Sequence, residues 1–134
     1  MSQTIRRTCL AFAVAVVLAV SPALSDSPTV KTIGGIEYLN GGVGLNERAT
    51  MRSDFPLKLI FARTDTAFVN SVDVTIFDQF GKVVFDLLAD NGPWLYVNLP
   101  AGFYRVRAEY QEIARESTVR IDGPGDQEEL TLLW

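Results

Sequence analysis

Pairs of acidic residues in predicted loops are the side chains of this chain whose spacing could support chemistry. Asp86 and Asp90 surround the end of a predicted strand, and Asp122 and Asp126 flank a glycine-rich turn. Two carboxylates can act as acid and base on a glycosidic bond. Calcium needs about six to eight oxygen ligands, and neither cluster has the spacing of a helix-loop-helix calcium site. We interpret both clusters as solvated turns and predict no metal site and no catalytic residues.

The side chains that most enzymes use near neutral pH are missing from the sequence. There is no histidine, and the one cysteine, Cys9, lies in the segment that we interpret below as a cleaved signal. The mature chain would then have no Ser-His or Cys-His pair and no imidazole or thiolate metal ligand. Any catalysis would depend on carboxylates, Lys, Tyr or Arg, so we predict a protein that is not an enzyme and has no cofactor.

Residues 1–25 have the pattern of a secretory signal peptide. Arg6 and Arg7 precede an apolar run of roughly a dozen residues, which is short for a membrane-spanning helix of about 20 residues. Ala23-Leu24-Ser25 resembles a cleavage site before Asp26. Cleavage would lower the formal net charge from −4 to −6, because two arginines are lost. We predict a periplasmic protein that binds neither nucleic acid nor membrane, with a flexible leader over 26–33 and one domain over 34–134.

Alternation of apolar and polar residues predicts strands through most of the mature chain. Leu99-Pro100-Ala101-Gly102 suits a type I turn that joins strands over 94–99 and 103–110, which we expect to lie in one antiparallel sheet. Further short strands, separated by turn residues, are expected over 33–39, 57–62, 72–77, 83–87, 112–121 and 130–134. A short helix over 47–52, capped by Asn46, would follow the glycine-rich run 41–44. This spacing predicts an all-β Greek-key sandwich of about seven strands.

Two aromatic residues stand on the polar side of a predicted strand. Trp94 and Tyr96 alternate with Leu95 and Val97, so they face away from the expected core. On an open face they could bind a sugar ring or a peptide, with Phe103 and Arg105 beside them. Alternatively, residues 34–52 fold over them and make them core. The run 41–44 has two interpretations as well: an anion-binding nest or, as we prefer, tight backbone packing.

Three segments together resemble the carboxypeptidase regulatory-like domain. They are Val72-Asp73-Val74-Thr75-Ile76, Gly81-Lys82-Val83-Val84 and Leu99-Pro100-Ala101-Gly102-Phe103-Tyr104-Arg105-Val106. The resemblance covers about residues 70–121 and implies a transthyretin-like sandwich that serves as a structural or binding module. The run 38–44 is similar to small exported proteobacterial proteins that carry this domain alone. The related hydroxyisourate hydrolases need histidines and a different C-terminus, whereas this chain ends Leu-Leu-Trp.

These observations predict a non-catalytic module that binds a periplasmic protein or cell-envelope component. The expected contact residues are Trp94, Tyr96, Phe103 and Arg105. The strand 130–134 is a second candidate, because it could pair with the edge of a neighbouring sheet. One alternative is a carbohydrate-binding module that uses the same aromatics, and a third is a carboxylate-based hydrolase. The sequence leaves the oligomeric state open.

Overall fold

The computed structural model describes residues 29–51, 54–65 and 67–134 of the chain. Within them the chain forms nine strands and one short helix. In chain order these are β1 (Lys31–Ile33), β2 (Ile36–Gly41), α1 (Leu45–Thr50), β3 (Leu57–Ala62), β4 (Val72–Phe77), β5 (Val83–Ala89), β6 (Trp94–Val97), β7 (Gly102–Tyr110), β8 (Ile113–Ile121) and β9 (Glu128–Leu133).

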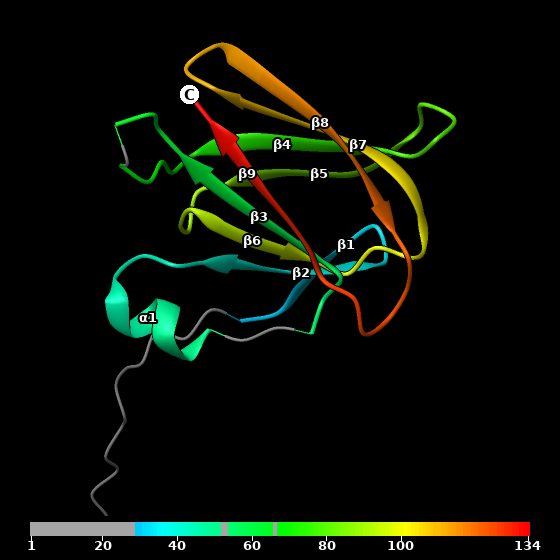
Figure 1. Cartoon of the computed structure of the whole chain (residues 1–134), viewed down its shortest axis with the longest axis horizontal. Coiled ribbons are helices and arrows are strands. Elements are labelled where there is room, and N and C mark those ends of the chain that lie inside the picture. Colours follow the sequence, from blue (N-terminus) through cyan, green and yellow to red (C-terminus); the bar gives the residue numbers. More distant parts are fainter. Residues whose placement is uncertain (1–28, 52–53, 66) are drawn as a thin grey trace, which may run out of the picture.

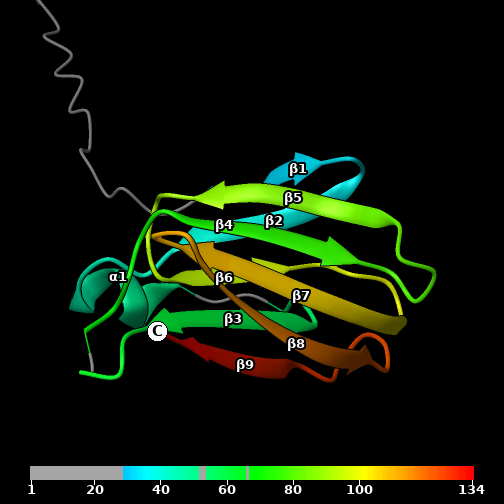
Figure 2. The same ribbon diagram turned by 90° about the horizontal axis from the view of Figure 1, so that it is seen from above.

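The strands form two sheets that pack face to face (Figures 1 and 2). Sheet A has five strands in the order β1-β2-β6-β3-β9, and sheet B has four in the order β5-β4-β7-β8. Neighbouring strands run antiparallel except β3 and β9, which are parallel. The predicted all-β sandwich is confirmed, with nine strands among the described residues where about seven were expected.

Strand alternation produces the main core between the sheets. Every second residue of β3, β4 and β7 is apolar and buried, while most of the residues between them are partly exposed or exposed. Burial of this apolar surface stabilises the sandwich at about 25 cal/mol per Å². The core residues include Val74, Ile76, Leu99, Tyr104 and Val106, all of which are buried.

The turn at residues 99–102 joins the two sheets and does not close a hairpin. The strands on either side of it, β6 and β7, were expected to share one sheet. Instead β6 pairs with β2 and β3 in sheet A, and β7 pairs with β4 and β8 in sheet B. β6 lies between β2 and β3 inside sheet A, and its residues Leu95 and Val97 pack into the core between the two sheets.

The N-terminal part of the domain differs from the prediction in two places. Lys31–Ile33, expected in the leader, forms β1 and pairs with β2 across a turn in which Gly34 and Gly35 have positive φ. The helix begins at Leu45, earlier than expected, and Gly44 is its N-cap without a side-chain hydrogen bond. The expected cap by Asn46 is therefore wrong, since Asn46 lies inside α1. Gly44 can serve because its φ of 93° is accessible to glycine.

Some predicted features lie outside the described residues. The signal peptide over 1–25, the first part of the leader and position 52 of the expected helix belong to this group. In the part of the chain that the structure describes, no helix is long and apolar enough to cross a membrane.

Candidate functional site

Trp94 and Tyr96 lie on the outer face of sheet A, but the chain covers the part of this face around them. Tyr96 is buried, with only 4% of its surface exposed, in a small second core with Leu39 and Met51. Trp94 is half-buried against this cluster. The cover comes from the chain that follows β2, including α1, which lies beside sheet A in Figure 1. Of the two interpretations that the sequence left open, the structure therefore favours the one in which Trp94 and Tyr96 are covered. The described residues that cover them lie within 42–51 of the expected segment, whereas 36–41 pair with β6 as β2.

The glycine-rich run fixes this cover close to the sheet. A Cβ atom on Gly42 would lie 2.9 Å from Cγ of Trp94, so only glycine lets the backbone approach the indole ring this closely. The amide of Gly42 also donates a hydrogen bond to Oε1 of Glu47, at 3.0 Å. The predicted tight packing is thus present, and the amide faces a carboxylate that belongs to the chain itself.

Cations lie over the rings at this face. Nζ of Lys58 is 3.9 Å from the centre of the Trp94 ring, and the guanidinium of Arg48 is 4.2 Å from the Phe68 ring. The Trp94 indole N–H is buried and has no hydrogen-bond acceptor among the described residues. Both the helix segment and these cations occupy the surface where a sugar ring would have to stack.

A buried asparagine holds the loop that leads into Trp94. The amide nitrogen of Asn40 donates to the carbonyl oxygens of Gly92 and Trp94, at 3.0 and 2.8 Å. Its Oδ1 accepts from the backbone N–H of Asn91 at 2.9 Å. Three hydrogen bonds satisfy a polar side chain that is only 6% exposed, and they attach β2 to the 90–94 segment.

Phe103 and Arg105 lie on the opposite side of the sandwich. Both belong to β7 and point outward from sheet B, whereas Trp94 and Tyr96 belong to β6 of sheet A. The predicted contact residues therefore do not form one surface. The difference follows from the turn at 99–102, which carries the chain from one sheet to the other.

Phe103 and Arg105 line a groove at one end of sheet B. Its volume is about 480 Å³, within the range of about 300–1,000 Å³ that small-ligand sites have. Phe103 is 56% exposed, so its ring is accessible from the groove. We call this hollow the β7–β8 groove; it is lined by Asp78, Gln79, Gly81, Phe103, Tyr104, Arg105, Thr118, Val119 and Arg120.

Two guanidinium groups of the groove stack on aromatic rings. The Arg105 guanidinium lies 4.2 Å from the centre of the Phe77 ring, and that of Arg120 lies 5.5 Å from the Phe103 ring. Arg120 is directly opposite Phe103 in the β7–β8 register, so it is a diagonal neighbour of Arg105. Stacked guanidinium groups keep their planar edges available for carboxylate or phosphate oxygens.

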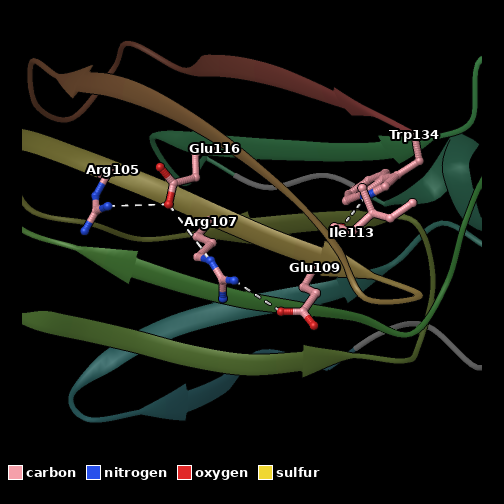
Figure 3. Close-up of polar contacts among 6 residues, drawn as sticks. All are labelled: Arg105, Arg107, Glu109, Ile113, Glu116 and Trp134. Atoms are coloured by element: carbon pink, nitrogen blue, oxygen red, sulfur yellow. Dashed lines mark hydrogen bonds and ion pairs between the residues drawn. The ribbon is translucent and has the colours of Figure 1, made fainter.

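Carboxylates of the same face partly balance these arginines (Figure 3). The figure shows Glu116 between Arg105 and Arg107, with oxygen to nitrogen distances of 3.4 and 3.9 Å. Arg107 also lies 3.4 Å from Glu109. Arg107 is also directly opposite Glu116 in the β7–β8 register. Exposed pairs of this kind contribute about 0–1 kcal/mol, so an incoming anion can compete with Glu116 for Arg105.

Tyr104 is a buried residue that lines the β7–β8 groove. Its hydroxyl donates a hydrogen bond to the carbonyl oxygen of Pro100 at 2.8 Å. Burial raises the pKa of Tyr104 above 10.0, and the negative charge of Asp78 raises it further. Asp78 is itself held in place, since its Oδ1 accepts from the backbone N–H groups of Phe80 and Lys82. Tyr104 is therefore a neutral hydrogen-bonding group at neutral pH.

The acidic clusters singled out in the sequence do not gather into a site. Asp122 pairs with Arg120 at 2.8 Å. Across the described ranges, no group of three or more histidine, cysteine or acidic residues is placed to hold a metal ion. Asp78 and Arg120 were not predicted as site residues, because their place beside Phe103 depends on which strands are neighbours: Asp78 follows β4, and Arg120 is opposite Phe103 in β8. The pairing of Phe103 with Arg120 was the missing signal.

Comparison with known proteins adds no relative: no protein-family model matches the chain, and no curated protein does. The resemblance to the carboxypeptidase regulatory-like domain therefore stays a prediction.

Proposed function

We propose that this protein is a non-catalytic binding module of the periplasm that recognises a carboxylate-bearing segment of a protein or envelope component through the β7–β8 groove. The observation that carries the proposal is the juxtaposition of an exposed Phe103 ring with the guanidinium groups of Arg105 and Arg120 around a 480 Å³ hollow. An aromatic ring supplies apolar contact area at low entropic cost, and arginines select a planar anion.

The chemistry of the groove supports binding over catalysis. Its titratable groups are Asp78, Tyr104 and the two arginines. Burial and the nearby negative charge of Asp78 raise the pKa of Tyr104, so its phenol is not poised to exchange protons near neutral pH. The absence of histidine from the sequence agrees with this. A transthyretin-like binding domain and export through the signal peptide remain part of the same proposal.

Direct titration with defined probes tests the proposal. We expect a short acidic peptide, such as a phenylalanine–aspartate repeat, to shift the backbone amide NMR signals of Thr118 and Val119 in a saturable way. The neutral asparagine version of the peptide is the matched control. Arg105→Gln should weaken binding by about tenfold, which is the loss of one charge-assisted contact of about 1.4 kcal/mol. Saturable shifts around Trp94 instead of Thr118 would contradict the assignment of the groove.

The other candidate functions predict different results in the same assay. A carbohydrate-binding module predicts saturable shifts with neutral oligosaccharides and none with the acidic peptide. A carboxylate-based hydrolase predicts release of reducing sugar from a glycan panel, abolished by substitution of a carboxylate. Because Tyr96 is buried and Trp94 is half-buried against the same cluster, the carbohydrate-binding alternative lacks the open Trp94–Tyr96 face that it was expected to use.

A further inference from the structure

The sandwich has four sheet edges, and three of them are protected. β1 is only three residues long and has an exposed lysine, Lys31. β8 and β9 lie side by side and are joined by side chains: the Trp134 indole donates to the carbonyl oxygen of Ile113, and Nε of Arg115 donates to that of Leu133, both at 2.8 Å. Figure 3 shows Trp134 over Ile113. Short, charged or covered edges are the usual means by which proteins prevent unwanted strand pairing.

The fourth edge, β5, is only partly protected, by one charged residue and a bulge. It has seven residues, of which only Asp86 is charged. Val83 and Leu88 are exposed apolar residues on it. A bulge occurs near its start, but Phe85–Ala89 keep a continuous register with β4. In the described residues, no strand pairs with its other side. The outward backbone groups of Phe85–Ala89 therefore form a template for another strand.

The charge beside β5 selects the strand that fits. Asp86 points outward, and the next outward residue on β5, Leu88, is paired with Asp73 of β4. Asp73 in turn is opposite Glu109 of β7. Neither Asp73 nor Asp86 forms an ion pair with a described residue. An added strand therefore gains most from basic side chains on its outward face, while its inward side chains continue the apolar row of Phe85 and Leu87.

We propose that β5 accepts an extended segment of a partner protein in which apolar and basic residues alternate. A second copy of this chain fits less well, because its own β5 has no basic residue to place near Asp86. The mature chain would also carry a net charge of −6, which disfavours self-association and attracts a basic segment. This inference uses a surface separate from the β7–β8 groove, and either can fail without the other.

Peptide binding with and without backbone donors tests the proposal. The probe is a fluorescently labelled peptide of alternating valine and lysine, measured by anisotropy with the mature protein. We expect saturable binding that protects the amides of Phe85–Ala89 from hydrogen exchange. Two control peptides separate the causes: one replaces lysine by glutamate, and the other carries N-methyl groups on alternate residues, so that it cannot pair. Both controls should bind at least tenfold more weakly.

Two charge reversals complete the test. Asp86→Lys should weaken binding of the valine–lysine peptide at least tenfold, whereas Asp126→Lys, in the distant β8–β9 turn, should leave binding within about twofold. Circular dichroism verifies that both variants fold. Equal binding of the N-methylated peptide, or equal effects of the two substitutions, would overturn the proposal. A concentration-dependent dimer that protects β5 and excludes the peptide would overturn it as well, since the occupant would then be a second copy.

Discussion

Tyr104 links the core of the molecule to the proposed groove through one hydroxyl group. Its pKa is raised by burial and, to a smaller extent, by Asp78, so the folded state favours the neutral phenol. The contribution of Tyr104 to the free energy of unfolding therefore depends on pH. This contribution to stability is complete below the unfolded-state pKa of about 10, and it is lost as the pH rises through the higher folded-state pKa.

We predict that Tyr104 titrates above pH 10 in the folded protein. Phenolate absorbance measured across the alkaline range, with Tyr104→Phe subtracted, isolates its signal. Asp78→Asn should move the midpoint down while keeping an amide oxygen that can accept from the Phe80 and Lys82 amides. A difference signal with its midpoint at or below pH 10 would contradict the account.

Individual residues differ in how well the sequence predicts them. Val74, Ile76 and Val106 could be placed in the core because strand alternation fixes which side they face. Asn40 could not, because an asparagine beside glycines is typical of a turn. It is buried only because the carbonyl groups of Gly92 and Trp94 lie next to it, about fifty residues further along the chain. Such long-range partners leave no local pattern.

At the scale of elements, the segment containing α1 determines what sheet A can bind. It covers Tyr96 and packs Gly42 against the Trp94 ring. Gly42 and Gly44 both have positive φ, but a side chain on Gly44 would meet open space. The two glycines therefore allow the effect of packing on Trp94 to be separated from the effect of backbone conformation.

We predict that Gly42→Val destabilises the protein more than Gly44→Val does. The difference should be about 1–3 kcal/mol, the usual cost of forcing extra atoms into a packed site. Urea denaturation measures it, and in a Trp134→Phe background Trp94 is the only tryptophan and reports locally. Only Gly42→Val should shift its emission to longer wavelength. Equal effects of the two substitutions would mean that the cover does not pack on Trp94.

Strand assignment was accurate along the chain, but strand partnership was not. The strands predicted over 57–62 and 72–77 have the observed bounds. The expectation that β6 and β7 share a sheet is wrong, because a tight turn can join strands of one sheet or of two. Periodicity shows which face of a strand is apolar and cannot show which strand lies beside it. This single ambiguity separated the predicted contact residues into two groups.

For the molecule as a whole, the arrangement of the two sheets gives its outer faces different roles. The chain covers the outer face of sheet A around Tyr96, whereas sheet B presents the β7–β8 groove at one end and has β5 as an edge strand. Phe103, Arg105 and Arg120 are accessible at this groove. We therefore expect a partner to bind through sheet B.

Site-specific crosslinking in cells that express the full chain tests whether recognition occurs through sheet B. A photoreactive phenylalanine analogue is placed at Phe103, in the groove, or at Leu45, which is 80% exposed on the covering helix. Each is tested with and without Arg105→Glu. We expect one recurrent adduct from position 103 that disappears with Arg105→Glu, and no matching adduct from position 45. An adduct from position 45 alone, or one from position 103 that persists with Arg105→Glu, would contradict it.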